Sequence, residues 1–195
     1  MALTRARVIT GDEMLGQIVT ADIRAVLTRP RDPDKLLADV AHMRNRMVAQ
    51  HRQQPALWDC KHRRGGLIDI EFITQYLLLR HASTEPAILA TGTAEVLRRL
   101  IDAEILAEDT GAALLDALAL WHQVQGVLRV TLEAPESAGL PLDVVDRLLT
   151  RATGIADPAL RTHRIDQAAL TALAIYDRLI GVPAAVLPKP ETGLS

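Results

Sequence analysis

Residues 67–82 limit the possible folds of this chain more than any other stretch, because they contain no glycine or proline and are apolar on two sides. A basic run and two glycines precede them, which predicts that a loop ends and a helix begins near Leu67. Two apolar stripes on nearly opposite sides of that helix need two packing partners, so the pattern predicts a buried central helix. The stripes consist of Ile70, Ile73 and Leu77, and of Ile68, Phe72 and Leu79.

Asp69 and Glu71 are one residue apart, a spacing that resembles the carboxylate pairs with which nucleotide-handling enzymes hold Mg²⁺. On a strand the two side chains would share a face, but on a helix they point about 200° apart. The predicted helix therefore excludes one ion held by both. Structural roles are favoured for the two acids: Asp69 suits the positive end of the helix, and Glu71 can pair with Gln75.

The composition favours a single helical domain. The chain has 195 residues, of which 49% are hydrophobic and only 3% aromatic, and alanine and leucine dominate the apolar set. A formal net charge of −2 gives no overall reason to expect binding to nucleic acid or to an anionic membrane. No apolar run reaches the ~18 to 20 residues of a membrane span, and the first residues lack the apolar core of a signal peptide.

Cysteine and histidine usage argues against metal and disulfide chemistry. Cys60 is the one cysteine, so an internal disulfide and cysteine-based zinc sites are excluded, which fits a reducing, cytoplasmic setting. The six histidines have no compact ligand spacing, and we expect no metal site.

The remaining pattern predicts an all-α fold, a bundle of about seven helices around residues 67–82. Asp32 and Asp157 are expected to cap helices that begin at Pro33 and Pro158. In the helix predicted to begin at Pro33, we expect Arg44, Arg46 and Arg52 to belong to the polar part of the surface, away from the packing partner. We expect residues 1–10 to be the remnant of a junction with another domain, 11–181 to be the bundle and 182–195 to be a disordered tail. The other expected helices span 12–27, 33–54, 93–101, 108–132, 142–153 and 158–180.

The segment Lys61–Leu77, KHRRGGLIDIEFITQYL, closely resembles a signature of the bacterial glutamine synthetase adenylyltransferases, in the copy found in their C-terminal, adenylylating half. The stretch Ala2–Arg7 resembles the place where the nucleotidyltransferase core of that family passes into its helical domain. Together with the helical pattern, the resemblance covers roughly residues 2–181.

The resemblance implies a bifunctional enzyme. One half of such proteins transfers AMP from ATP to a tyrosine of glutamine synthetase, and the other removes it by phosphorolysis, under control of PII signal proteins. Each half pairs a magnesium-dependent core with a helical domain. The core carries a Gly-Ser pair followed by paired aspartates, and this chain has no Gly-Ser pair. We therefore expect no catalytic residue, no cofactor and no activity in this chain alone, with ATP and magnesium bound in the complete enzyme.

The implied partners are glutamine synthetase, a PII signal protein and the chain's own nucleotidyltransferase core, without nucleic acid or membrane. Two other functions remain open. The chain could be a non-catalytic helical module that binds glutamine synthetase or a PII protein, or the helical domain of a related uridylyltransferase.

The candidate binding residues lie mainly at the start of the central helix. Lys61, Arg63 and Arg64 beside Gly65 and Gly66 could hold an anion such as the ATP phosphates, since free backbone NH groups and the helix end favour negative charge. The alternative is that the glycines serve packing or a positive φ and that the basic side chains are solvated. Further candidates on the side of the nucleotide are Asp69, Glu71, Arg5 and Arg7, and the two arginines are expected to lack partners without the core.

Overall fold

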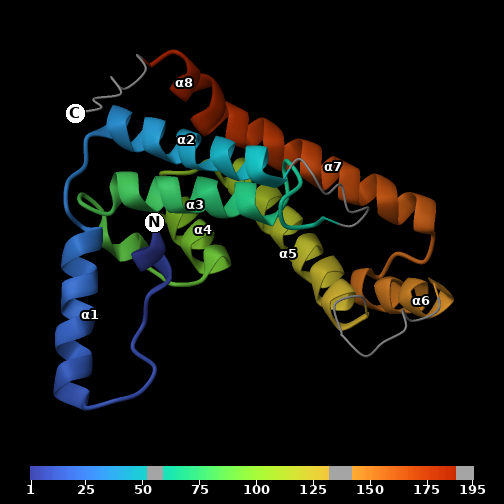
Figure 1. The fold of residues 1–195 in the computed structure, drawn as a ribbon, viewed down its shortest axis with the longest axis horizontal. Coiled ribbons are helices and arrows are strands. Elements are labelled where there is room, and N and C mark those ends of the chain that lie inside the picture. The colour runs from blue at the N-terminus through green and yellow to red at the C-terminus, as the bar shows by residue number, and fades with distance from the viewer. Residues whose placement is uncertain (52–58, 132–141, 188–195) are drawn as a thin grey trace.

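The computed structural model describes residues 1–51, 59–131 and 142–187, and it is all-α, as predicted (Figure 1). Within these ranges there is no strand, and seven helices have ten or more residues. They are α1 (Glu13–Leu27), α2 (Pro33–His51), α3 (Leu67–His81), α4 (Thr93–Asp102), α5 (Glu108–Thr131), α6 (Leu142–Thr153) and α7 (Pro158–Tyr176). The predictions for Arg52, for the helix ends at 52–54 and 132, and for residues 188–195 of the tail lie outside the described ranges.

Helix α3 is the buried centre of the bundle, which confirms the prediction from its two stripes. Eleven of its fifteen residues are buried, and α2, α4, α5 and α7 all pack against it. Figure 1 shows α3 running alongside α2, below it in this view, with α5 crossing the bundle obliquely. Because four helices pack against it, α3 connects the parts of the bundle.

The helix starts follow the predicted caps. The carboxylate of Asp32 accepts a hydrogen bond from the backbone NH of Lys35 at 2.7 Å, so it caps α2. Asp157 caps α7 in the same way, through the NH of Ala159. These short polar contacts explain why the boundaries could be predicted from neighbouring residues alone.

The predicted end of the last helix is wrong, because the chain stays helical past Gly181. A π-helical turn, Asp177–Gly181, follows α7 and continues into α8, Val182–Ala185. Pro183 does not break the helix, because it lies in the first turn of α8, where an NH is not needed. By length and composition alone the continuous helix from Pro158 to Ala185 could cross a membrane, which is weak evidence because the core helix of a bundle passes the same test.

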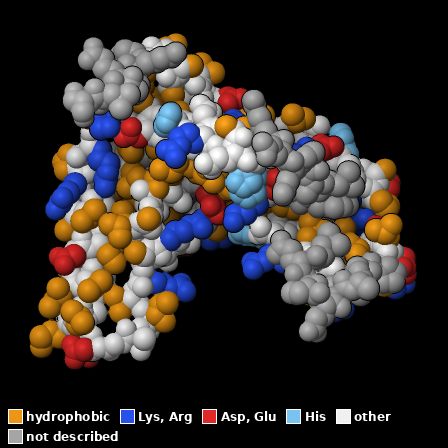
Figure 2. All heavy atoms as spheres, in the orientation of Figure 1, with side chains coloured by type: hydrophobic (Ala, Val, Ile, Leu, Met, Phe, Trp, Pro, Cys, Tyr) orange, Lys and Arg blue, Asp and Glu red, His pale blue; other side chains and the backbone are white. Residues whose placement is uncertain are grey.

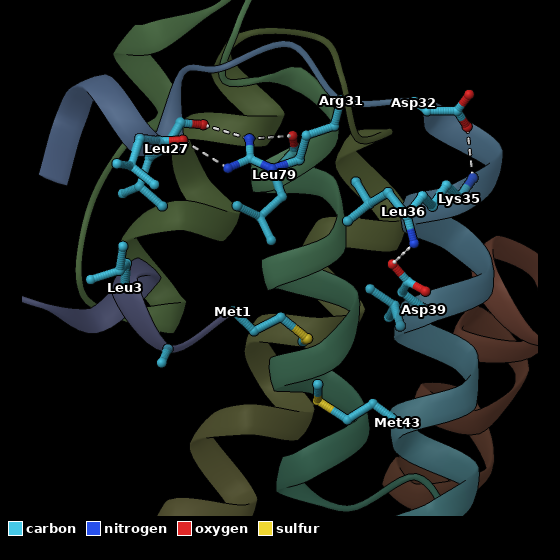
Figure 3. Close-up of a pocket in the computed structure, with 13 residues that line it drawn as sticks. Met1, Leu3, Leu27, Arg31, Asp32, Lys35, Leu36, Asp39, Met43 and Leu79 are labelled. Atoms are coloured by element: carbon cyan, nitrogen blue, oxygen red, sulfur yellow. Dashed lines mark hydrogen bonds and ion pairs between the residues drawn. The ribbon is translucent and has the colours of Figure 1, made fainter. Parts of the chain in front are cut away.

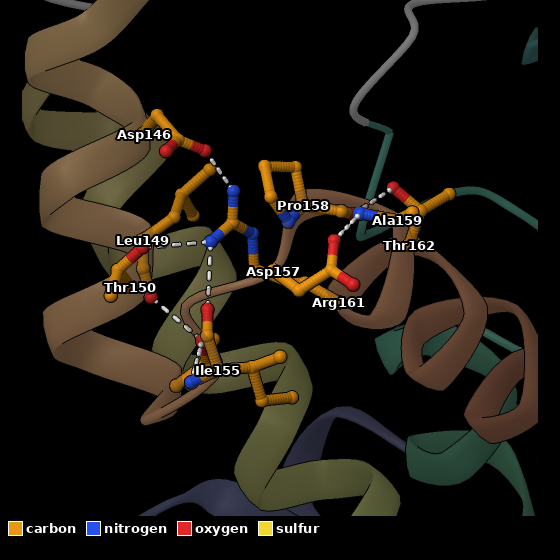
Figure 4. A network of polar contacts seen from close by, with 10 residues as sticks. Asp146, Leu149, Thr150, Ile155, Asp157, Pro158, Ala159, Arg161 and Thr162 are labelled. Atoms are coloured by element: carbon orange, nitrogen blue, oxygen red, sulfur yellow. Dashed lines mark hydrogen bonds and ion pairs between the residues drawn. The ribbon is translucent and has the colours of Figure 1, made fainter.

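A buried arginine fixes the corner between α6 and α7 (Figure 4). Arg161 is 3% exposed and forms an ion pair with Asp146 of α6. Its guanidinium also donates to Thr150 Oγ1 at 3.0 Å and to the carbonyl of Ile155 at 2.9 Å. One side chain of α7 thus binds both α6 and the connection between the two helices, which stabilises this corner.

Helix α1 stands away from the body of the bundle, with much of its apolar face in solvent (Figures 1 and 2). Its pattern predicted an amphipathic helix, yet Met14 and Ile18 are 71% and 53% exposed and only Leu27 is buried. Arg31 holds the base of α1, donating to the carbonyls of Leu27 and Val26 at 2.8 Å (Figure 3). Much of the apolar surface of α1, including Met14 and Ile18, is therefore left uncovered by the described residues.

Candidate functional site

Gly65 is locked into the turn before α3 by contacts on three sides. Its NH donates to Asp69 Oδ2 at 2.5 Å, and its carbonyl accepts from Trp121 Nε1 at 3.1 Å. Its φ is +75°, and a Cβ atom there would lie 1.9 Å from the carbonyl oxygen of Ala169. Glycine is thus required both by the backbone conformation and by close packing against α7.

The backbone NH groups at the start of α3, which the predicted anion site would use, are already bonded within the protein. The NH of Leu67 donates to the carbonyl of Cys60 at 3.0 Å, and that of Ile68 donates to Lys61 at 3.3 Å. The NH of Asp69 donates to Gly66 at 3.1 Å. Because the preceding loop folds back and supplies acceptors, no donor of the first turn is left for a phosphate.

Asp69 forms a buried ion pair with Arg44 of α2, and both side chains are 0% exposed. Arg44 Nε donates to Asp69 Oδ1 at 2.6 Å, and Arg44 Nη2 donates to the carbonyl of His62 at 3.2 Å. The assignment of Arg44 to the polar part of the surface is therefore wrong. The spacing in the sequence could have indicated that Arg44 is buried, since it follows Leu37 and Val40 at i+7 and i+4 on the buried side of α2.

Glu71 points away from Asp69 and pairs with Arg5 at 2.8 Å. Arg5 also donates to Thr93 Oγ1 at 3.0 Å, so the expectation that it would lack a partner is wrong. No group of three or more His, Cys, Asp and Glu side chains in the described ranges could hold a metal ion. Asp69 and Glu71 are thus engaged by different arginines, on different sides of α3.

The basic side chains of the turn have different surroundings. Arg63 forms an ion pair with Asp166 at 2.6 Å, and the guanidinium of Arg64 lies 4.7 Å from the ring centroid of Tyr176. Lys61 and Arg7 are exposed, and neither has an ion-pair partner among the residues that the structure describes. Arg63 and Arg64 of the predicted cluster thus have partners within the fold, whereas Lys61 of that cluster, and Arg7 near the chain start, remain open to a partner.

Cys60 is buried at 5% exposure, and burial raises the pKa of its thiol from 9.0 to about 11. We expect it to react with iodoacetamide at pH 8 about 100-fold more slowly than an unfolded-state cysteine, since only the thiolate reacts and the pKa differs by about two units. Mass spectrometry of native and urea-unfolded protein measures both rates. Equal rates would show that Cys60 is accessible and its pKa unshifted.

Three curated proteins are similar to this chain over most of its length. The chain is 39% identical over 184 residues to the bifunctional glutamine synthetase adenylyltransferase/adenylyl-removing enzyme of Rhodopseudomonas palustris, covering 93% of this chain and 18% of that protein. The protein of the same name from Bradyrhizobium diazoefficiens is 40% identical over 160 residues, covering 80% and 16%. The one from Xanthobacter autotrophicus is 33% identical over 184 residues, covering 94% and 18%.

A family model described as GlnD PII-uridylyltransferase matches residues 38–174, from within α2 almost to the end of α7. The chain belongs to this GlnD PII-uridylyltransferase family. The matched range of this family contains the buried Arg44–Asp69 pair and the Gly65 turn. The chain spans less than a fifth of the length of the curated relatives it matches.

Proposed function

We propose that this chain acts as the helical domain of the adenylylating half of a glutamine synthetase adenylyltransferase. The observation that supports it is the 39% identity over 93% of the chain to a protein of that name, of which the chain spans 18%. The complete protein would transfer AMP from ATP to glutamine synthetase and remove it again, in the cytoplasm and without a membrane or nucleic acid. The uridylyltransferase alternative is less favoured, because its family model matches only residues 38–174, whereas the adenylyltransferase of R. palustris aligns over 184 residues.

In this proposal the domain contributes a wall beside the catalytic core and supplies no reacting group. ATP and magnesium would bind to the core, since the NH groups at the start of α3 are already bonded and Asp69 and Glu71 are paired with arginines. Lys61 and Arg7 are the candidates for contact with nucleotide, glutamine synthetase or a PII protein, because they are exposed and unpaired within the described ranges.

The surface that supports contact with the core is the outer face of α1 together with the groove at its base. A groove of about 580 Å³ runs between the chain start, the end of α1 and α2, and it is mostly apolar (Figure 3). Met1, Leu3 and Met43 line it, and the exposed Met14 and Ile18 lie further along α1. An apolar surface of this kind is typical of an interface between domains.

A chimaera tests the proposed function directly. This chain would replace the matching 184-residue segment of the R. palustris relative, and AMP transfer from labelled ATP to glutamine synthetase would be measured with magnesium. We expect the chimaera to transfer AMP and the isolated chain to transfer none. A chimaera that folds but transfers no AMP would contradict the proposal.

Within that chimaera, charges on the exposed apolar face of α1 are expected to disrupt the contact with the core. Met14→Asp together with Ile18→Asp should lower AMP transfer at least about tenfold, because carboxylates would be buried without partners. Thr20→Asp is the matched control, since Thr20 lies on the opposite, polar side of the exposed helix and should leave transfer unchanged. Equal effects of the two changes would show that this face makes no such contact.

A binding module without catalysis is the second candidate, favoured by the same unpartnered face of α1. A pull-down with the isolated chain distinguishes it, using purified glutamine synthetase and a purified PII protein. Retention of either partner by the chain alone supports the module, whereas retention only by the chimaera supports a domain that depends on its core.

A further inference from the structure

Residues 7–11 connect the 3₁₀ helix Ala2–Arg5 to α1, and none of their backbone NH or carbonyl groups has a hydrogen-bond partner among the described residues. The nearest backbone bond before them runs from the NH of Ala6 to the carbonyl of Leu3, at 3.1 Å. After them, the carbonyl and the side chain of Asp12 already belong to the first turn of α1. The segment therefore presents an unbroken row of free donors and acceptors.

The residues that flank this segment have the backbone conformation of a strand. Ala6 has φ −71° and ψ 137°, and Asp12 has φ −62° and ψ 135°, both within the β region. Gly11 has φ +132°, a value that favours glycine, and it ends the run next to the cap of α1. Figure 1 shows the chain passing from its first turn to the start of α1 with no helix in between. A strand over residues 7–10 would therefore need little rearrangement at either end.

The side chains of the segment are those that favour strands. Val8, Ile9 and Thr10 are consecutive β-branched residues, which fit a pleated sheet better than a helix. Val8 lies against α1, since a Cβ atom at Gly16 would be 3.4 Å from Val8 Cγ1, whereas Ile9 is 83% exposed. Because alternate side chains of a strand point to opposite faces, α1 covers one face of this segment and leaves the face of Ile9 open.

The apolar surface around the segment indicates a protein partner. Water can bind the free backbone groups, but it disfavours an exposed isoleucine next to Val19 of α1, which is itself 39% exposed. The groove proposed above for contact with the core begins at the same end of the chain, where Met1 and Leu3 line it. Free backbone groups that adjoin apolar surface are typical of a place where a strand is added to a sheet edge.

We propose that residues 7–10 add as a strand to an exposed β-sheet edge of the catalytic core, an inference that rests on the function proposed above. Hydrogen bonds between the segment and the edge strand would supply affinity through the backbone alone. Ile9 would join the apolar face of the extended sheet, and α1 would lie against the other face through Val8. The segment would thereby fix the position of the helical bundle relative to the core.

Hydrogen exchange at single-residue resolution, measured by mass spectrometry with electron-transfer dissociation, tests the proposal in the chimaera described above. In the isolated chain the amides of residues 7–10 should exchange as fast as those of an unstructured peptide, because they have no partner among the described residues. In the chimaera, alternate amides of the segment should exchange at least about 100-fold more slowly, since an added strand bonds to its neighbour through every second residue.

The amide of Ala156 is the control for that measurement. It is likewise exposed and without a partner in the described ranges, but it lies in the α6–α7 connection on the other side of the molecule in Figure 1. Its exchange should be equally fast in both proteins. Fast exchange of the segment in a chimaera that transfers AMP would overturn the strand and leave the proposed function intact. Slow exchange already in the isolated chain would indicate pairing between copies and would also overturn it.

Proline substitutions separate the backbone role of the segment from a role of its side chains. Of Ile9→Pro and Thr10→Pro, one removes the NH that is protected in the chimaera, and the other removes an NH that points away, which an edge strand tolerates. The first should restore fast exchange and lower AMP transfer at least about tenfold, and the second should do neither. Neither should change the melting temperature of the isolated chain, where both amides are unbonded within the described protein. Equal effects of the two changes in the chimaera would refute the strand.

Discussion

Replacement of Gly65 by alanine is expected to lower the free energy of unfolding by at least about 3 kcal/mol, because two independent costs combine. A φ of +75° costs a residue with a Cβ atom about 1 to 2 kcal/mol. The new Cβ would also lie 1.9 Å from the carbonyl oxygen of Ala169, and backbone on α7 cannot rotate away as a flexible side chain would. In urea unfolding followed by circular dichroism, the midpoint should fall accordingly.

Gly154→Ala is the matched control for that change. Gly154 ends α6 with a φ of +71°, nearly that of Gly65, but a Cβ atom there would meet nothing within 4 Å. Its substitution should therefore cost only the conformational part, about 1 to 2 kcal/mol. Equal destabilisation by the two changes would mean that α7 does not pack against the turn as closely as the structure shows.

The helices could be predicted from the sequence because their signals are local. The caps at Asp32 and Asp157 act within two or three residues, and the two stripes of α3 lie on one continuous helix. The prediction of where α7 ends was wrong because of contacts outside the local sequence. Gly181 and Pro183 usually stop a helix, but one π-helical turn accommodates the glycine beside Asp177 and places the proline in a first turn.

The candidate site was predicted less well, because its residues are used by partners far away in the sequence. Gly65 meets Trp121 and Ala169, which are separated from it by 56 and 104 positions, and no local pattern reveals such contacts. The alternative that the glycines serve packing and a positive φ is confirmed for Gly65. The amide donors that would have bound an anion are satisfied by the loop itself, which only its folded path can show.

The buried ion pair between Arg44 and Asp69 predicts that a change of Asp69 strongly lowers the stability of the fold. Asp69→Asn is expected to lower the free energy of unfolding by about 3 to 5 kcal/mol, because the charge of Arg44 would stay buried without compensation. At about 2 to 4 °C per kcal/mol, the melting temperature should fall by roughly 6 to 20 °C. The exposed pair Lys35–Asp39, 3.0 Å apart, is the control, and Asp39→Asn there should cost about 0.5 kcal/mol or less.

A double-mutant cycle distinguishes loss of the pair from general damage at the site. Arg44→Met alone should also be destabilising, since it leaves the buried carboxylate of Asp69 with only the partly exposed Arg64, 3.5 Å away, as a counter-charge. The double variant should be more stable than either single variant, because no net charge remains buried and the introduced side-chain amide can still accept from the NH of Gly65 through its oxygen. We expect a coupling of at least about 2 kcal/mol in thermal and urea unfolding. Additive effects would mean that the two side chains do not compensate each other inside the bundle, and Asp69 would again be available for chemistry at the start of α3.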